Sequence, residues 1–178
     1  MLLVNLYGPP GSGKSTGAAY IFSQLKMRGV NAELITEYAK EKVWEGAENV
    51  LKNQAYIFGK QFHYISRLEE KVDVAVTDSP LLLSTIYNQD KKRLGPEFDA
   101  LVKRVDKSYM HRLDLLIKRT KPYNTKGRLQ TEQESDALFF KIKELLDSSD
   151  ICYTLISGEK ERYDEIVNWI IKELGLER

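Results

Sequence analysis

Eight residues near the N-terminus have the types and spacing of a phosphate-binding site. The segment Gly8-Pro9-Pro10-Gly11-Ser12-Gly13-Lys14-Ser15 matches the pattern G-x-x-x-x-G-K-[ST]. Glycines let a backbone wrap closely around phosphate oxygens, and successive N–H groups in such a loop form a nest for an anion. Lys14 can reach the β- and γ-phosphates of a nucleoside triphosphate, and the Ser15 hydroxyl can ligate Mg²⁺. The segment, with Thr16 after it, therefore predicts a binding site for ATP with Mg²⁺.

The neighbours of this segment favour the same interpretation. The pattern alone arises by chance in many proteins, where it is a glycine turn with an incidental lysine. Here an apolar run at residues 2–7 precedes it, and residues 14–28 follow with Ala18, Ile21, Phe22 and Leu25 at helical spacing. A strand that leads into the loop and a helix that points its positive end at it are what phosphate binding requires.

The rest of the chain alternates between predicted strands and helices. Further strands are expected at residues 32–36, 73–77, 113–118 and 152–156. Helices are expected at residues 49–71, 81–87, 96–111, 132–146 and 162–174, with a charged connector at residues 90–93. This alternation predicts an α/β fold with a parallel sheet, right-handed crossovers and helices on both faces. With no repeat or linker in sight, we expect one domain over residues 1–178.

Two carboxylates follow predicted strands and so reach the edge of the sheet where the loop lies. Asp78 follows the third strand, where it could hold Mg²⁺ through water or activate a nucleophile; the alternative is that it caps the next helix. Glu37 follows the second strand, where it could act as general base toward an acceptor hydroxyl. Its alternative role is to complement the dipole of the helix that starts there.

A basic segment follows the fourth predicted strand. Residues 118–128 carry five basic residues and no acidic one, with Pro122 and Gly127 marking a loop. Charge runs are usually only solvated. This one, however, is placed where a lid over residues 119–131 would bring cations onto a transferring phosphate, and Arg119 and Arg128 are the candidates.

A third feature lies on the predicted helix between the second and third strands. Gln54, Phe58 and Gln61 are spaced to share one face of that helix. The two amides could form hydrogen bonds with the edge of a nucleobase, and the aromatic ring could stack on its face. The alternative is a core-edge face with two ordinary polar residues, and the sequence leaves this choice open.

Composition and charge narrow the class of protein. The chain has 178 residues, with 27 Lys and Arg against 26 Asp and Glu, so no global field favours duplex DNA or a membrane surface. Cys152 is the single cysteine, and no apolar stretch approaches the roughly 20 residues of a membrane helix. Without a signal peptide pattern, we expect a cytoplasmic protein, in the host cytoplasm if it is viral. The sequence does not set the oligomeric state.

Several of these motifs together resemble the P-loop kinase superfamily of small nucleoside and nucleotide kinases. Within it, the chain is similar to the group that contains the ribosylnicotinamide kinase domain and many small phage-encoded AAA-like ATPase or kinase proteins. The resemblance is carried by GPPGSGKST at residues 8–16, TEYAKE at 36–41, TDSPLLLS at 77–84 and KPYNTKGRLQTEQE at 121–134.

The resemblance implies a P-loop NTPase three-layer sandwich with a five-stranded sheet in the order 2-3-1-4-5. It also implies an ATP donor and an acceptor site between Glu37, Asp78 and the lid, with Glu37 as base. The chain departs from the deoxynucleoside kinases, because Ser79 stands where those enzymes have an arginine.

Three functions follow as hypotheses. The first is an ATP-dependent kinase that phosphorylates a hydroxyl or phosphate of a nucleoside, nucleotide or related small molecule. The second is a polynucleotide or modified-base DNA kinase, in which basic residues and Tyr123 would line a groove for a strand; these are Lys91, Lys92, Arg93, Lys103, Arg104 and the lid cations. The third is a regulatory NTPase module. An N-K-x-D guanine reader is absent from the sequence, which argues against a GTP switch.

Overall fold

The central sheet is parallel throughout. The computed structural model describes residues 1–120, 122–123 and 131–176. Within them the strands are β1 (Leu2–Tyr7), β2 (Ala32–Ile35), β3 (Val74–Thr77), β4 (Arg112–Lys118) and β5 (Thr154–Ser157). They pair in the order β2-β3-β1-β4-β5, which confirms the P-loop NTPase sheet expected from the sequence.

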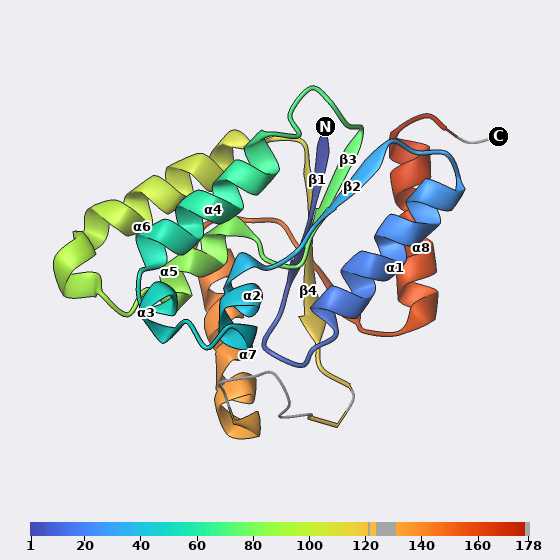
Figure 1. Cartoon of the computed structure of the whole chain (residues 1–178). Coiled ribbons are helices and arrows are strands. Elements are labelled where there is room, and N and C mark those ends of the chain that lie inside the picture. Colours follow the sequence, from blue (N-terminus) through green and yellow to red (C-terminus); the bar gives the residue numbers. More distant parts are fainter. Residues whose placement is uncertain (121, 124–130, 177–178) are drawn as a thin grey trace.

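Helices cover both faces of this sheet (Figure 1). One layer consists of α1 (Lys14–Met27) and α8 (Lys160–Glu173), which lie side by side. The other face is covered by α4 (Gln54–Ser66), η1 (Leu81–Leu83), α5 (Ser84–Tyr87), α6 (Lys91–Ser108) and α7 (Glu132–Ser148), while α2 (Tyr38–Trp44) and α3 (Glu48–Leu51) connect β2 to α4. In the described part of the chain, none of these helices combines the length and the apolar character needed to cross a membrane.

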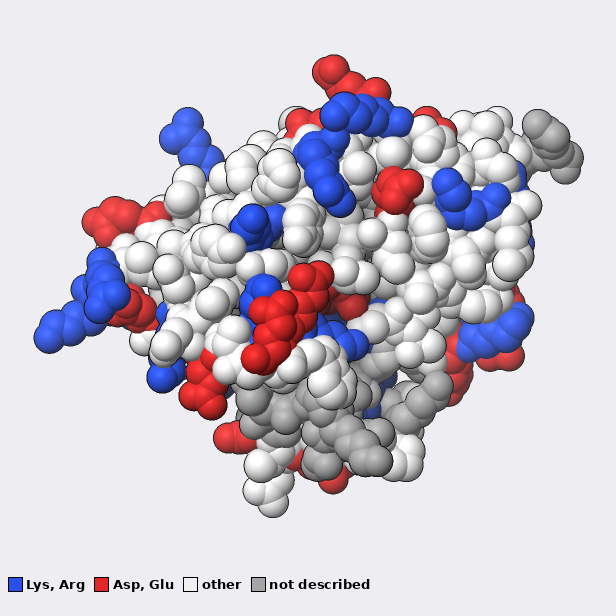
Figure 2. Space-filling model, viewed as in Figure 1, with Lys and Arg blue, Asp and Glu red and all other residues white. Residues whose placement is uncertain are grey.

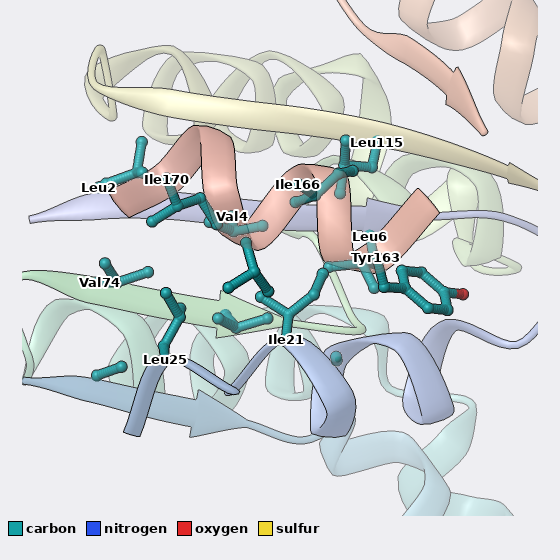
Figure 3. Packing of buried hydrophobic residues seen from close by; sticks show 14 of the residues in the cluster. Leu2, Val4, Leu6, Ile21, Leu25, Val74, Leu115, Tyr163, Ile166 and Ile170 are labelled. Atoms are coloured by element: carbon teal, nitrogen blue, oxygen red, sulfur yellow. The ribbon is translucent and has the colours of Figure 1, made fainter. Parts of the chain in front are cut away.

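The two hydrophobic cores follow from the two-residue period of the strands. In β1, Leu2, Val4 and Leu6 pack toward α1 and α8, whereas Leu3 and Tyr7 pack toward the other helical layer. Figure 3 shows the first of these clusters, with side chains from α1 and α8 meeting those of the central strands. Burial on both sides explains why β1 reads as a continuous apolar run.

Two boundaries differ from the sequence prediction. The helix expected at residues 49–71 is two helices. The first, α3, ends at Leu51 with Lys52 as its C-cap, and the Asn53 side chain then accepts a hydrogen bond from the Tyr56 N–H to cap α4. The charged connector expected at residues 90–93 is wrong. Lys91 starts α6, and Gly95, with φ of 65°, introduces a kink before Pro96 resumes the helix.

A buried polar network ties Asn5 and Tyr7 of β1 to β4 and α6. The Arg112 guanidinium donates to both carboxylate oxygens of Asp114, at 2.6 and 2.7 Å, and to Asp106 at 2.7 Å. It also donates to the Tyr7 hydroxyl at 3.1 Å, and Asn5 donates to Asp114 at 2.9 Å. Each buried carboxylate is therefore paired, as low-dielectric burial requires. The network joins β1, β4 and α6.

Helix α1 approaches α8 closely because Gly17 has no side chain. A Cβ atom at this position would lie 2.5 Å from the ring of Tyr163, which is buried in the same core. The ring is 3% exposed and packed in this core, so a larger residue must displace it or push the two helices apart. This close approach sets the position of the helix that begins in the phosphate loop.

We predict that Gly17→Ala destabilises the protein by about 1–3 kcal/mol, as expected for overpacking a filled core. The matched control is Gly59→Ala in α4, another glycine inside a helix, where an added Cβ would meet no atom within 4 Å. That change should stabilise the protein by about 0.4–1 kcal/mol, because alanine loses less backbone entropy on folding. Urea unfolding measures both. Equal effects of the two substitutions would contradict the role assigned to Gly17.

Candidate functional site

The phosphate loop leaves β1 at Gly8 and enters α1 at Lys14. Gly13 precedes the helix with φ of 99°, a left-handed conformation that glycine adopts without strain. The Ser12 N–H donates to the Pro9 carbonyl oxygen at 3.2 Å, and the Lys14 ammonium donates to the same oxygen at 3.1 Å. The loop is thus closed on itself, with the N–H groups of the first turn of α1 at its rim.

Gly8 is required by a close approach. A Cβ atom here would lie 2.6 Å from the Ser12 hydroxyl oxygen and 2.9 Å from the Ile117 carbonyl oxygen. The chain therefore passes between the loop and β4 with no room for a side chain. The glycine at the first position of the sequence pattern is explained by this packing.

A serine outside every motif holds the loop from the other side. The Ser135 hydroxyl, in the first turn of α7, donates to the Pro10 carbonyl oxygen at 2.7 Å. The helix is fixed there by a capping box, in which Thr131 and Glu134 each bond to the other's backbone N–H. Ser135 was not predicted from the sequence, although the T-x-x-E pattern before it is a recognisable helix-start signal.

Beside the loop lies a cavity of about 350 Å³. Its walls come from the loop, from α2 and α3, from one face of α4, and from the chain that follows β3. The lining residues used below are Lys14, Ser15, Glu37, Lys40, Val43, Leu51, Gln54, Ile57, Gln61, Asp78, Ser79, Leu83 and Tyr87. The structure therefore brings the loop, Glu37 and Asp78 together in one hollow.

Asp78 is 4% exposed, and its Oδ1 atom has no hydrogen-bond partner among the described residues. The alternative in which Asp78 caps the next helix is wrong, because Pro80 precedes η1 and no side chain caps it. A buried carboxylate oxygen without a partner is costly, so a cation or donor from outside the chain would relieve it.

Glu37 sits at the N-cap position of α2, but its side chain makes no capping hydrogen bond. Burial raises the pKa of Glu37; the Lys14 ammonium opposes that rise, the Asp78 carboxylate adds to it, and Lys40 opposes it. Burial, followed by the charge of Glu37, also holds the pKa of the Tyr87 hydroxyl well above its usual range. Glu37 is thus a carboxylate whose basicity is increased by its surroundings, beside a lysine of the phosphate loop.

The face of α4 that lines the cavity is not the one expected. Gln54, Ile57 and Gln61 line it, whereas Phe58 packs edge-to-face on Phe98 in the core, with ring centroids 5.8 Å apart. Of the two alternatives left open by the sequence, stacking of a base on Phe58 is therefore wrong, and the core-edge alternative holds for this residue.

The two amides differ in their bonding. Gln61 accepts from the Tyr38 N–H at 3.3 Å and donates to the Thr77 hydroxyl at 3.4 Å, so it links α2 to β3. Gln54 is buried in the wall of the cavity, and its side-chain amide has no hydrogen-bond partner within the described part of the chain.

The basic segment is only partly described. Arg119 donates to the carboxylates of Glu132 and Asp136, both at 2.6 Å, and its guanidinium lies 5.5 Å from the centre of the Tyr123 ring. Arg119 does not line the cavity. Arg128 lies outside the described residues, as does most of the expected lid at 119–131, so both stay predictions.

The oxygen atoms at the loop fit Mg²⁺. Magnesium favours a few hard oxygen ligands from the protein, completed by water and substrate phosphates. The Ser15 hydroxyl and the unpartnered Asp78 carboxylate oxygen line the same cavity and supply that donor set. In the described ranges, no three His, Cys, Asp or Glu side chains gather into a cluster that could hold a metal by themselves.

These features define a P-loop kinase-like nucleotide-binding domain, and comparison with known proteins agrees. A family model described as an AAA domain matches residues 3–162, so the chain belongs to this P-loop NTPase-like family. No curated protein matches it in sequence.

Among 122 similar chains of solved structures is the NadR protein, crystallised in complex with NR. That chain is 17% identical, with a TM-score of 0.70 over 98% of the present chain. The present chain spans 52% of the length of that protein. At this identity the likeness shows the fold alone.

We predict that Glu37→Gln raises stability at neutral pH. The pKa of Glu37 is higher in the folded state than in the unfolded state, so protonated Glu37 stabilises the fold. This stabilisation is fully present at pH values below the pKa of the unfolded state, and it is lost as the pH rises through the pKa of the folded state. The neutral amide avoids that loss, so the melting temperature should exceed that of wild type at pH 7 and converge with it near pH 4. Each 1 kcal/mol corresponds to roughly 2–4 °C.

The control is Glu41→Gln on the exposed face of the same helix, α2. An exposed carboxylate away from the cavity should change stability by less than about 0.5 kcal/mol. A Glu37→Gln protein that melts below wild type at pH 7 would contradict the electrostatic description of Glu37.

Proposed function

We propose that the protein is an ATP-dependent kinase that transfers the γ-phosphate to a hydroxyl group of a small nucleoside-like acceptor. The observation that carries this proposal is the shared cavity. Lys14 of the phosphate loop and the carboxylates of Glu37 and Asp78 line one hollow of about 350 Å³. A nucleotide hydrolase needs room only for water, whereas this volume is within the range of small-molecule sites.

The charge of the cavity supports a hydroxyl acceptor over a phosphate acceptor. Its cationic lining residues, among those described, are Lys14 and Lys40, whereas Glu37 and Asp78 are acidic. Lys14 belongs to the donor site, so an acceptor phosphate would face two carboxylates with little compensation. Apolar walls from Val43, together with Leu51, Ile57 and Leu83, and the unpaired amide of Gln54 suit a planar, uncharged group that carries polar atoms.

In this mechanism the protein contributes position, a base and charge. The phosphate loop and the Lys14 ammonium hold the triphosphate. Glu37 accepts the proton of the acceptor hydroxyl as its oxygen attacks the γ-phosphorus. The new O–P bond forms while the bond from the γ-phosphorus to the bridging oxygen breaks, and ADP leaves with that electron pair. Ser15 and Asp78 would hold Mg²⁺, which neutralises phosphate charge when bound.

A polynucleotide acceptor has less support. The basic residues of α6 that were candidates for a strand groove do not line the cavity, and Arg93 pairs with Asp90 at 3.3 Å. Figure 2 shows Lys and Arg interspersed with Asp and Glu on the viewed face, without a continuous basic track. A regulatory NTPase module differs from the proposed kinase in needing no acceptor.

The decisive test is a labelled-ATP acceptor panel. Nucleosides, nucleotides and short oligonucleotides are incubated with γ-labelled ATP, Mg²⁺ and the protein, and transfer is measured. We expect label on an uncharged nucleoside or related alcohol, with little dependence on salt. Lys14→Ala should abolish it while the protein stays folded. Label on oligonucleotides with a steep salt dependence would favour the polynucleotide kinase instead. ATP hydrolysis without any labelled acceptor would overturn the kinase.

We predict that Asp78→Asn lowers kcat by roughly 10–100-fold, because an amide is a weaker ligand for Mg²⁺ and carries no charge. Raising the Mg²⁺ concentration should recover part of the loss. Stability should change little, since Asp78 makes no capping bond. The control is Asp73→Asn, at an exposed residue just before β3. Unchanged kcat in Asp78→Asn at limiting Mg²⁺ would contradict the metal role.

A further inference from the structure

Two buried hydroxyl groups near the phosphate loop have no hydrogen-bond partner among the described residues. They are the phenol of Tyr163, 3% exposed, and the hydroxyl of Ser12, 5% exposed. A buried polar group without a partner costs about 1–3 kcal/mol, and few such groups occur in native proteins. Neither group belongs to the acceptor cavity, so their positions need an explanation of their own.

The Tyr163 hydroxyl lies beneath the start of α1. Figure 3 shows the ring leaving the core between α1 and α8, with its oxygen directed past the other side chains of the cluster. The oxygen is 3.7 Å from where a Cβ of Gly13 would be, and 3.5 Å from the corresponding point at Gly158. That point at Gly158 is itself 3.1 Å from the Ser12 carbonyl oxygen. The hydroxyl is therefore enclosed by the phosphate loop and the turn after β5.

This location is on the opposite side of the loop from the acceptor cavity. The cavity is walled by segments that follow β2 and β3, whereas Tyr163 and Gly158 follow β5. Because β1 lies between β3 and β4 in the sheet, the loop separates the two regions. A group at the Tyr163 side can contact the donor nucleotide without meeting the acceptor.

The backbone groups of α1 nearest to the hydroxyl already have hydrogen-bond partners. The Gly17 N–H donates to the Gly13 carbonyl oxygen at 2.8 Å, so the nearest backbone groups of α1 are paired with each other. The three surrounding glycines offer no side chain. Burial raises the pKa of Tyr163 to about 12, so the phenol keeps its proton at neutral pH and can donate.

We propose that Tyr163 is a nucleotide-binding residue on the donor side of the loop, whose O–H donates to an oxygen of the bound nucleotide. The ligand chemistry is an accepting oxygen of the phosphate chain or of the ribose. Because the Ser12–Gly13 backbone encloses the hydroxyl, this contact requires that backbone to shift when the nucleotide binds. The inference rests on the ATP site of the proposed function, but not on the transfer of phosphate to an acceptor.

The test compares nucleotide affinity and stability in Tyr163→Phe, which keeps the ring against Gly17 and removes only the hydroxyl. Titration calorimetry with ATP and Mg²⁺, without acceptor, should show binding about tenfold weaker than wild type. Without ligand, the variant should have a melting temperature equal to or higher than that of wild type. The substitution removes a buried hydroxyl that has no partner among the described residues, and burying such a group costs free energy. A purely structural role for Tyr163 would move stability and not affinity.

The matched control is Tyr20→Phe. The Tyr20 ring lies 6.2 Å from the Tyr163 ring, but its hydroxyl donates to the Asp164 carboxylate at 2.5 Å. This variant should lose some stability and keep its ATP affinity. A parallel titration with inorganic tripolyphosphate identifies the accepting oxygen: weakening of both ligands indicates the phosphate chain, and weakening of ATP alone indicates the ribose.

Wild-type ATP affinity in Tyr163→Phe would overturn the inference and leave the hydroxyl as a group satisfied by buried water. Weaker ATP binding in this variant would uphold the inference even where the acceptor panel stays unlabelled, so the kinase proposal can fail separately. Failure of the wild-type protein to bind ATP would overturn both.

Discussion

The site depends on a backbone that can approach its neighbours without side chains in between. Gly8 passes within contact distance of the Ile117 carbonyl of β4, and Gly17 rests directly on the Tyr163 ring. Interiors are close-packed, so these contacts fix the loop and its helix as rigidly as any hydrogen bond would. The consequence is that the entry of the loop at Gly8 and the body of α1 at Gly17 are positioned by the sheet and by α8 before any ligand arrives. Such preorganisation is what makes a loop effective for binding an anion.

The carboxylates of this protein fall into two groups, one paired with a cation and one without such a partner. Asp106 and Asp114 are buried, and both are held by the Arg112 guanidinium in a paired network that links β1, β4 and α6. Glu37 and Asp78 at the sheet edge have no such partner: the pKa of Glu37 is raised mainly by burial, and one Asp78 oxygen is unpaired among the described atoms. Folding alone would favour pairing these groups as well. The difference is the expected signature of a site in which stability is exchanged for reactivity.

The sequence predicted the parts that follow local rules. Periodicity and turn chemistry located all of β1 to β5 to within about two residues, because buried parallel strands and glycine-rich turns are readable locally. The same rules placed the loop, Glu37 and Asp78 at one edge. They could not decide where tertiary contacts do: the sequence left open whether Phe58 faces a ligand or the core, and its ring packs on Phe98 in the core. Ser135 and Tyr163 act on the loop from more than 100 residues away, and no local pattern identifies such partners.

The fold does not choose the reaction, since 122 chains of solved structures share it and folds of this kind serve many functions. What distinguishes this chain is the distribution of its polar groups around the loop. The Gln61 side chain is hydrogen-bonded to Tyr38 and Thr77, whereas the Gln54 side chain, which also lines the cavity, has no such partner among the described residues. On the side of the loop opposite the cavity, the buried hydroxyl of Tyr163 also has no hydrogen-bond partner among the described residues. Groups that folding leaves unpaired are those that a ligand can pair, and here they lie on both sides of one loop. In the proposed kinase reaction the attacking and leaving oxygens lie in line on opposite sides of the γ-phosphorus, so the acceptor hydroxyl has to enter from the cavity while ADP stays at the loop.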